Sequence, residues 1–352
     1  MKSSALAALC CAGVFASAAS AQSSLTLWGI TDLWIGQITQ KSSDSPTTRQ
    51  TVLENGGASV SRWGLRGMED LGGGLQARFV LEQGIAPDTG TISKVSNLDQ
   101  GFNRAAYVGL VGAAGEVRLG RMLTAFDALR GSTNHLYDSS GFASTGQVWS
   151  ASTTAAHGLP AVIGSDYLAR GNNTVYYATP SLGPFSGSIS YSADEGASTA
   201  TLNPRLWTGH MQYAAGPLRI GYGYQTERFS TGKNNFHIVA GHYDFGPVRM
   251  VGAMQRQADE RVLGHLKSNE WEIGFDAPFG AATAAIGYAS SITRDDTGSR
   301  VIDARGLSLL GTYDLSRRTR LYVGFRKRKT LRVDGSVSLD ATRIGTGVMH
   351  RF

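Results

Sequence analysis

The sequence predicts an all-β fold, a sixteen-stranded antiparallel transmembrane β-barrel with a long third loop folded inward. Three observations support this prediction. Segments of about ten residues, the length that a tilted strand needs to cross a bilayer, alternate between apolar and polar side chains. Tight turns, most of them with glycine or proline, alternate with longer polar connections. The last alternating segment stops on an aromatic residue, Phe352.

The N-terminal residues predict export. Residues 1–21 combine a positive charge at Lys2, an apolar run and the small residues Ala19-Ser20-Ala21, which are the features of a cleaved secretory signal peptide. We therefore expect the mature chain to begin at Gln22 and residues 22–352 to form the barrel. No apolar stretch long enough for a transmembrane helix follows the signal.

The two cysteines of the chain, Cys10 and Cys11, both lie in this signal segment. A lipoprotein signal that uses one of them is the rival interpretation, but bulky Leu9 precedes Cys10 where small residues are needed. An exported chain without these cysteines has no disulfide, so packing and hydrogen bonds must supply its stability.

The alternating segments define two faces of the predicted wall. In the first, Leu25, Leu33 and Ile35 face one way and Asp32 faces the other. Later segments repeat the pattern, and in "EWEIGFDA" the apolar Trp271, Ile273 and Phe275 oppose Glu270, Glu272 and Asp276. Apolar side chains that face lipid and polar side chains that face a water-filled lumen explain this alternation.

The connections give the strand number. Seven are tight: "EDLGGGL", "LVGAAGEV", "TPSLGPF", "YAAGPLR", "YDFGPVR", "DAPFGAA" and "YDLSRRT". Between them lie eight longer connections, at residues 38–58, 85–102, 122–172, 194–205, 230–235, 258–267, 293–303 and 329–341. These connections join sixteen strands and put both ends of the barrel on the short-turn side. The first and last strands are then able to pair and close the wall.

The longest connection, residues 122–172, follows the fifth predicted strand. A barrel of sixteen strands encloses a space too wide for its own side chains to fill. A long loop without secondary structure is unusual unless it has a function. We therefore predict that this third loop folds inward and constricts the lumen.

The sequence resembles the general porins of Gram-negative bacteria, of the anion-preferring trimeric type. The stretches that carry the resemblance are "AQSSLTLWGITD", "SRWGLRGMEDLGGGLQARFVLE", "RAAYVGLVGAAGEVRLGR", "NNTVYYATP" and the terminal "HRF". The resemblance implies an outer-membrane location, a homotrimer and a third loop inside each pore. It also implies that Phe352 is recognised by the barrel-insertion machinery and that the first-strand region of Leu25, Gly29 and Leu33 contacts the neighbouring subunit.

Arginines on the lumenal face or at strand ends are the candidate pore residues. An arginine facing lipid at mid-depth costs about 2–4 kcal/mol, so these side chains belong inside, at an end or in a subunit contact. Each one fits either pore lining or a tie to an acidic residue such as Asp127 in the loop. As a group they favour anions. The candidates are Arg62, Arg66, Arg78, Arg104, Arg118, Arg121 and Arg170.

The predicted function is passive diffusion of small hydrophilic solutes and ions, especially anions, across the outer membrane. Outer-membrane lipid and lipopolysaccharide are the expected surroundings, with no nucleic-acid partner, no cofactor and no metal. A structural or adhesive barrel and an outer-membrane barrel enzyme are the rival hypotheses. The sequence contains neither G-x-S-x-G nor a phosphate-binding G-x-x-x-x-G-K-[ST], which weighs against an enzyme.

Overall fold

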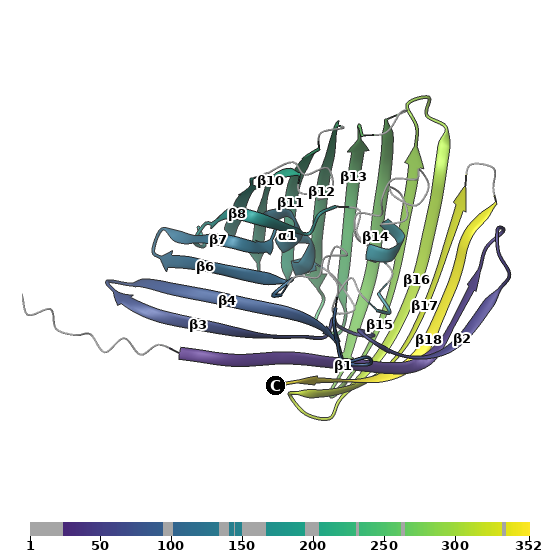
Figure 1. Ribbon diagram of the computed structural model, residues 1–352, viewed down its shortest axis with the longest axis horizontal. Coiled ribbons are helices and arrows are strands. Elements are labelled where there is room, and N and C mark those ends of the chain that lie inside the picture. The colour runs from purple at the N-terminus through teal and green to yellow at the C-terminus, as the bar shows by residue number, and fades with distance from the viewer. Residues whose placement is uncertain are drawn as a thin grey trace, which may run out of the picture.

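The computed structural model describes residues 24–93, 101–133, 141–143, 145–149, 167–193, 204–229, 232–261, 265–332 and 336–352 (Figure 1). The expected signal peptide, residues 1–21, lies outside the described residues, so this prediction and the start of the mature chain remain predictions.

Strands dominate the described chain, with two short helices between β7 and β8. In chain order the elements are β1 (Ser24–Lys41), β2 (Thr48–Asn55), β3 (Arg62–Gly72), β4 (Leu75–Ala86), β5 (Thr91–Ile92), β6 (Ala105–Gly112), β7 (Gly115–Leu123), α1 (Ala125–Thr133), α2 (Thr145–Trp149), β8 (Arg170–Ala178), β9 (Phe185–Ser192), β10 (Arg205–Ala215), β11 (Leu218–Phe229), β12 (Gly232–Asp244), β13 (Arg249–Asp259), β14 (Leu266–Phe279), β15 (Ala282–Arg294), β16 (Arg300–Asp314), β17 (Thr319–Arg332) and β18 (Val337–Arg351).

These strands form one antiparallel sheet with sixteen wall positions, as the sequence predicts. The second position is divided: β3 pairs with the first half of β1, whereas β2 pairs with its second half. The short β5 pairs only with the end of β4 and adds no wall position. The remaining neighbours follow chain order, from β4–β6 through β17–β18.

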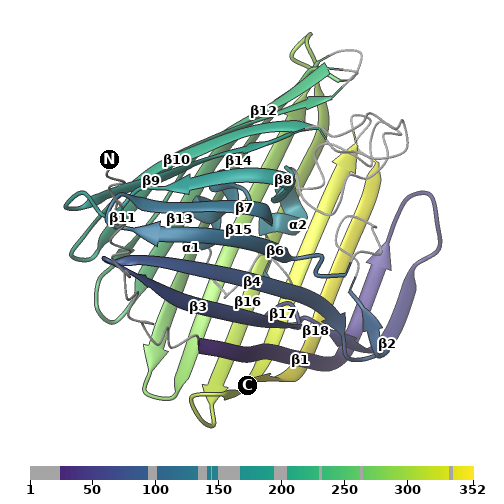
Figure 2. The same cartoon turned by 60° about the vertical axis from the view of Figure 1, so that its left-hand side comes forward.

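The wall closes between the first and last strands (Figure 2). β1 and β18 pair antiparallel from Ile30 opposite Arg351 to Lys41 opposite Asp340. Among the described residues, β1 and every strand from β6 to β18, as well as β3 and β4, have a paired neighbour on each side, whereas β2 pairs with β1 alone. Pairing on both sides is the condition for spanning lipid with β-structure. The predicted fold class is therefore confirmed.

The two faces of the wall follow the alternation in the sequence. On β14, Trp271 is 42% exposed on the outer face, whereas Glu270 and Glu272 are 2% and 4% exposed on the inner face. Large apolar side chains such as Val323 and Ile344 cover the outside, as a lipid-facing surface requires. In the described part of the chain, no helix is long and apolar enough to span a membrane.

All seven predicted tight turns connect consecutive strands, but several long connections are shorter than predicted. β1 continues to Lys41 and β2 occupies Thr48–Asn55, both within the predicted connection 38–58. β12 likewise begins at Gly232, inside the predicted connection 230–235. The backbone ladder extends past the apolar band, where water reaches both faces and apolar alternation disappears.

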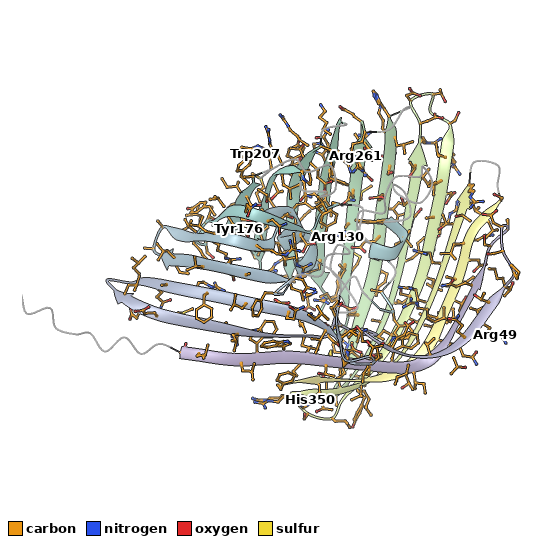
Figure 3. The ribbon with its side chains drawn as sticks, in the orientation of Figure 1. Arg49, Arg130, Tyr176, Trp207, Arg261 and His350 are labelled. Carbon is orange, nitrogen blue, oxygen red and sulfur yellow. The ribbon has the colours of Figure 1, made fainter. Side chains whose placement is uncertain are left out.

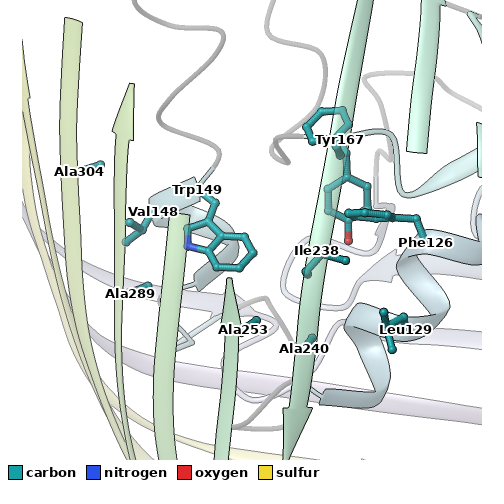
Figure 4. Packing of buried hydrophobic residues seen from close by; sticks show 11 residues of the cluster. Phe126, Leu129, Val148, Trp149, Tyr167, Ile238, Ala240, Ala253, Ala289 and Ala304 are labelled. Carbon is teal, nitrogen blue, oxygen red and sulfur yellow. The ribbon is translucent and has the colours of Figure 1, made fainter. Parts of the chain in front are cut away.

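The loop after β7 folds inward, onto the inner face of the opposite wall (Figure 4). Phe126 and Leu129 of α1 pack against Phe236 and Ile238 of β12, with no exposed surface on any of the four. Val148 and Trp149 of α2 belong to the same cluster, which includes the small side chains Ala289 and Ala304 of β15 and β16. Small residues on the wall thus make room for the aromatic side chains of the loop.

The C-terminal residue completes the closure at Gly29. The Gly29 amide donates to the Phe352 carbonyl oxygen at 3.0 Å, and the Phe352 amide donates back at 3.1 Å. The Phe352 ring lies over Gly29 on the outer face, where a Cβ on residue 29 would collide with it. What the structure shows for Gly29 is therefore a contact within the chain, and its predicted role in a subunit contact stays a prediction.

We expect Gly29→Trp to displace the Phe352 ring and destabilise barrel closure by about 1–3 kcal/mol, a typical cost of overpacking. The measurement is the urea midpoint of the folded barrel, followed by heat-modifiable mobility in gel electrophoresis. Leu27→Trp is the matched control, because Leu27 lies on the same outer face and is 58% exposed. Equal stability of the two variants would contradict the conclusion that the Phe352 ring needs a glycine at residue 29 to pack against the wall.

Candidate pore constriction

Two of the predicted arginines gather around one carboxylate. Glu82 on β4 accepts a hydrogen bond from Arg104 Nε, and Arg62 Nε lies 3.5 Å from the same Glu82 oxygen. The side chains are 11–19% exposed, so the ion pairs are partly shielded from water. Glu82 thereby aligns two arginines along the inner wall.

A second carboxylate, Glu116, organises two more. Arg78 Nη1 lies 2.9 Å from one of its oxygens and Arg118 Nη2 lies 2.6 Å from the other. Arg118 also stacks over the rings of Tyr107 and Tyr176, 5.4 and 4.8 Å from their centroids. Figure 3 labels Tyr176 among the side chains of the barrel. The stacking holds the guanidinium flat against the wall while its charge remains.

The last strand before the loop changes its parity at a bulge. Gly120 has a φ of 136°, and the pairing with β8 shifts between Gly120 and Met122. Arg121 is therefore turned to donate from Nε to the Asn103 carbonyl at 2.8 Å and from Nη1 to the Asn172 side chain. This arginine ties β7 to its neighbours, which is the structural role left open by the sequence.

Arg170 contacts the arginines around Glu82, whereas Arg66 does not. Arg170 Nε donates to the Arg104 carbonyl at 3.0 Å and also interacts electrostatically with Asp127. Arg66 lies on the inner face of β3, is exposed, and makes no hydrogen bond or ion pair in the described part of the chain. It is the predicted pore arginine whose guanidinium is most available to a passing ion.

Asp127 lies at the start of α1 and accepts a hydrogen bond from the Tyr167 hydroxyl. The loop itself carries a buried cation, Arg130, whose guanidinium lies 4.8 Å from the Trp149 ring centroid and 4.9 Å from that of Tyr167. These contacts connect α1, α2 and the segment that leads into β8.

Both ends of the loop are bonded to the inner face of β10 and β11. The Ala125 amide donates to Thr208 Oγ1 at 2.9 Å, and the Ala125 carbonyl accepts from His210 Nδ1 at 2.6 Å. At the other end, the Leu168 amide donates to Glu227 at 2.6 Å. Both ends of the loop are thus held against β10 and β11, which follow β8 and β9 in the sheet, whereas α2 lies against β15–β17 farther around the wall.

A third attachment, at residues 141–143, was not foreseen from the sequence. Arg326 Nη1 on β17 donates to the Gly141 carbonyl at 2.6 Å and approaches the Ala143 carbonyl at 3.4 Å. Phe142 between them is 1% exposed and meets the Trp34 ring edge-on at 5.0 Å. We call residues 141–143 with Arg326 the loop latch.

The latch rests on a buried carboxylate. Asp32 has no exposed surface and accepts the amides of Gly57, Ala58 and Ser59 at 3.2, 2.8 and 2.6 Å. The Tyr322 hydroxyl donates to the same carboxylate. The Phe142 amide in turn donates to the Gly57 carbonyl at 2.9 Å. One inward carboxylate of β1 therefore orders the bend between β2 and β3 that receives the loop.

The arrangement provides fixed charge and a fixed obstruction inside an open barrel. Among the described residues, no three histidine, cysteine, aspartate or glutamate side chains gather as metal ligands would. The guanidinium groups on the inner face of β3–β8 and the folded loop can act on ions through charge and through obstruction.

Comparison with known proteins identifies the family. The family model described as Gram-negative porin matches residues 5–331. This chain belongs to the Gram-negative porins. It is 33% identical to the outer membrane porin protein 32 of Delftia acidovorans, over 92% of this chain and 89% of that protein. It is also 30% identical to an outer membrane porin protein of Bordetella pertussis, over the full length of both.

Solved porin structures agree with the fold. The anion-selective porin from Comamonas acidovorans superposes with a TM-score of 0.78 at 28% identity, covering 94% of this chain and all of that one. OmpT of Vibrio cholerae in its trimer form superposes with a TM-score of 0.67 at 16% identity, over 94% of this chain and 99% of that one. The protein is an outer-membrane porin, as the resemblance implied.

The candidates predicted from the sequence did not include the arginines on the inner face of β17 and β18. Arg326, Arg328 and Arg343 lie on the inner face of β17 and β18. Arg343 Nη1 lies 3.6 Å from Glu54, and its guanidinium lies 6.0 Å from the Trp34 ring centroid. The same alternation places Arg326 inward, so the signal was present in the sequence, but nothing there indicated its partner in the loop.

We expect Arg326→Met to loosen the latch, because the Gly141 and Ala143 carbonyls lose a charged donor, at a cost of about 1–3 kcal/mol. In planar bilayers the variant should show more frequent conductance steps and noise than the parent porin. Lys327→Met, on the outer face of the same strand, is the matched control. A quiet Arg326→Met channel would show that residues 141–143 are held in place by other contacts.

Proposed function

We propose that this porin is a water-filled, anion-preferring channel for passive diffusion of small hydrophilic solutes and ions. The observation that carries the proposal is the charge balance on the inner face of β3–β8. There, Glu82 and Glu116 are each shared by two arginines, and Arg66 has no acidic partner among the described residues. The excess positive charge faces the lumen opposite the folded loop and should raise the local concentration of anions.

The relationship to a porin named for anion selectivity supports the same choice. The Comamonas acidovorans structure is titled as an anion-selective porin, and this chain is 28% identical to it. The rival hypotheses of an adhesive or purely structural barrel do not account for a loop held at three places across a wide barrel. An enzyme would need a nucleophile and base near the rim, and we expect no such activity.

We further propose that the barrel works as a homotrimer in the outer membrane, in contact with lipopolysaccharide, and that insertion machinery recognises Phe352. A trimer form is described for OmpT of Vibrio cholerae, whose fold this chain shares. The outer face of β1 presents Leu25, which is 68% exposed, near Leu33 and the seat of Phe352 at Gly29. A flat apolar face of this kind is suited to a neighbouring barrel.

The selectivity experiment is the zero-current potential across a salt gradient. The parent channel should prefer anions, and the preference should shrink as the mean salt concentration rises, because the Debye length falls from about 30 Å at 0.01 M to about 3 Å at 1 M. Changing Arg62 and Arg104 together to Gln should lower the preference more than a single change, since Glu82 then loses both partners. A parent pore that prefers cations would contradict the proposal.

Arg66→Gln tests the same field without breaking an ion pair. A unit charge acts on an ion 10 Å away with about 0.4 kcal/mol in water, so the anion-to-cation permeability ratio should fall about two- to fourfold. Lys329→Gln, on the outer face of β17, is the matched control and should leave the ratio unchanged. An unchanged ratio in Arg66→Gln would place this residue outside the ion path.

Assembly is tested by deleting Phe352 or replacing it with Lys. The charged side chain should not fit the apolar outer face over Gly29, so export should continue while the amount of folded porin in the outer membrane falls. Membrane fractionation with heat-modifiable mobility measures this amount. A normal level of folded porin after the deletion would refute the assembly role.

A further inference from the structure

Two histidines of the described chain, His210 and His242, lie on the inner face of the wall strands. His210 on β10 is committed to the loop, because its Nδ1 lies 2.6 Å from the Ala125 carbonyl oxygen and 3.0 Å from Ser188 Oγ. His242 on β12 makes no hydrogen bond with any described residue. Its imidazole is therefore not used to hold the fold, and histidine is the side chain whose charge ordinarily changes between pH 5 and pH 8.

His242 stands at the mouth of the barrel on the side of the tight turns. It is two residues from the end of β12 at Asp244, after which a tight turn leads to β13. The next inner side chain of β12 is Ala240, which is 1% exposed and packs in one cluster with Leu129 of α1 (Figure 4). His242 itself is partly exposed. It is thus the first inner side chain of β12 beyond the part of the wall that the loop covers.

Four charged side chains, one from each of the strands β11 to β14, act electrostatically on this imidazole. Arg219 lies directly opposite His242 on β11, a position in which the two Cβ atoms are about 4.5–5.5 Å apart. Arg249 on β13 donates from Nε to Asp276 on β14 at 3.1 Å and pairs with Asp244 across the strands.

The charges of these four side chains cancel, since two are arginines and two are aspartates. The next inner carboxylate of β14, Glu272, is 4% exposed and lies opposite Ala253, which belongs to the cluster under the loop. Protonation of His242 therefore adds one positive charge to a balanced group at the mouth. It also places an imidazolium next to the Arg219 guanidinium, where both can attract an anion.

We propose that His242, together with Arg219, makes the anion preference of this mouth depend on pH. With the imidazole neutral, the mouth contributes little to selectivity, whereas the protonated ring draws anions in and repels cations. The inference rests on the proposed function, because it concerns the selectivity of a conducting pore. It adds a specificity-determining residue on β12, away from the arginines of β3–β8.

The test is the zero-current potential across a potassium chloride gradient at low mean salt, with the full porin in planar bilayers at pH 8 and pH 5. Ordinary aspartates and glutamates stay ionised over this range, so the added charge comes from histidine. One added unit charge should raise the anion-to-cation permeability ratio about two- to fourfold. The increase should disappear near 1 M salt, where the Debye length is about 3 Å.

Two variants fix the two charge states at the same position. His242→Gln should keep the parent's pH 8 ratio at both pH values, because an amide does not titrate. His242→Arg should give at pH 8 the ratio that the parent reaches only at pH 5, and acid should change it little. A merely structural role of the ring would not shift the two variants in opposite directions.

His237→Gln is the matched control, since His237 lies on the outer face of the same strand, where its Nδ1 is 2.7 Å from the Tyr222 hydroxyl. His135→Gln and His157→Gln test the two histidines that lie outside the described residues. All three variants should retain the parent's increase between pH 8 and pH 5.

A parent ratio that does not change with pH would overturn the proposal, as would a His242→Gln porin that keeps the full increase. Loss of the increase in His135→Gln or His157→Gln would also overturn it, because the titrating group would then lie in the loop. The parent at pH 8 reports the fixed charges, so a cation preference there contradicts the proposed function and leaves the pH response as a separate measurement. Heat-modifiable mobility verifies that each variant is folded, and His242→Asn replaces His242→Gln if that variant is not.

Discussion

The pairing of β1 with β18 is the constraint on which the rest of the structure depends. Lipid offers no partner for backbone amides and carbonyls, so a sheet crosses it only when every wall strand has two neighbours. The register from Ile30 opposite Arg351 supplies the last of these pairings, and the mutual bonds of Gly29 and Phe352 extend it by one step. A glycine at residue 29 lets the terminal ring cover the seam on the lipid side.

A closed barrel of sixteen strands has an interior too wide for its own side chains to fill. Sixteen strands leave a wide, polar interior, and the loop between β7 and β8 partly fills it by packing Phe126, Phe142 and Trp149 against the wall. Its attachments come from inward side chains of distant strands, including Arg326 and the Asp32–Tyr322 pair. The described parts of the loop are therefore held against the inner wall at both ends and at residues 141–143.

The same residue type acts differently on the two faces. Arg78 and Arg118 on the inner face share Glu116 and lie over tyrosine rings. Arg256 on the outer face is exposed and has no acidic partner among the described residues. The surroundings of an arginine therefore depend on whether alternation places it on the inner or the outer face, and on its position along the strand.

The sequence alone determined the strand number, the closing pair of strands, the two faces and an inward-folded third loop, because membrane thickness and backbone pairing leave few alternatives. It also placed Arg62, Arg78 and Arg118 inside, since period-two alternation is local. Only the tertiary structure decided what these side chains touch. Asp32 and Tyr322 are 290 residues apart, and Arg326 meets Gly141 across 185. The hairpin extensions beyond residue 38 were also hidden, because outside lipid the backbone pairs without an apolar pattern to reveal it.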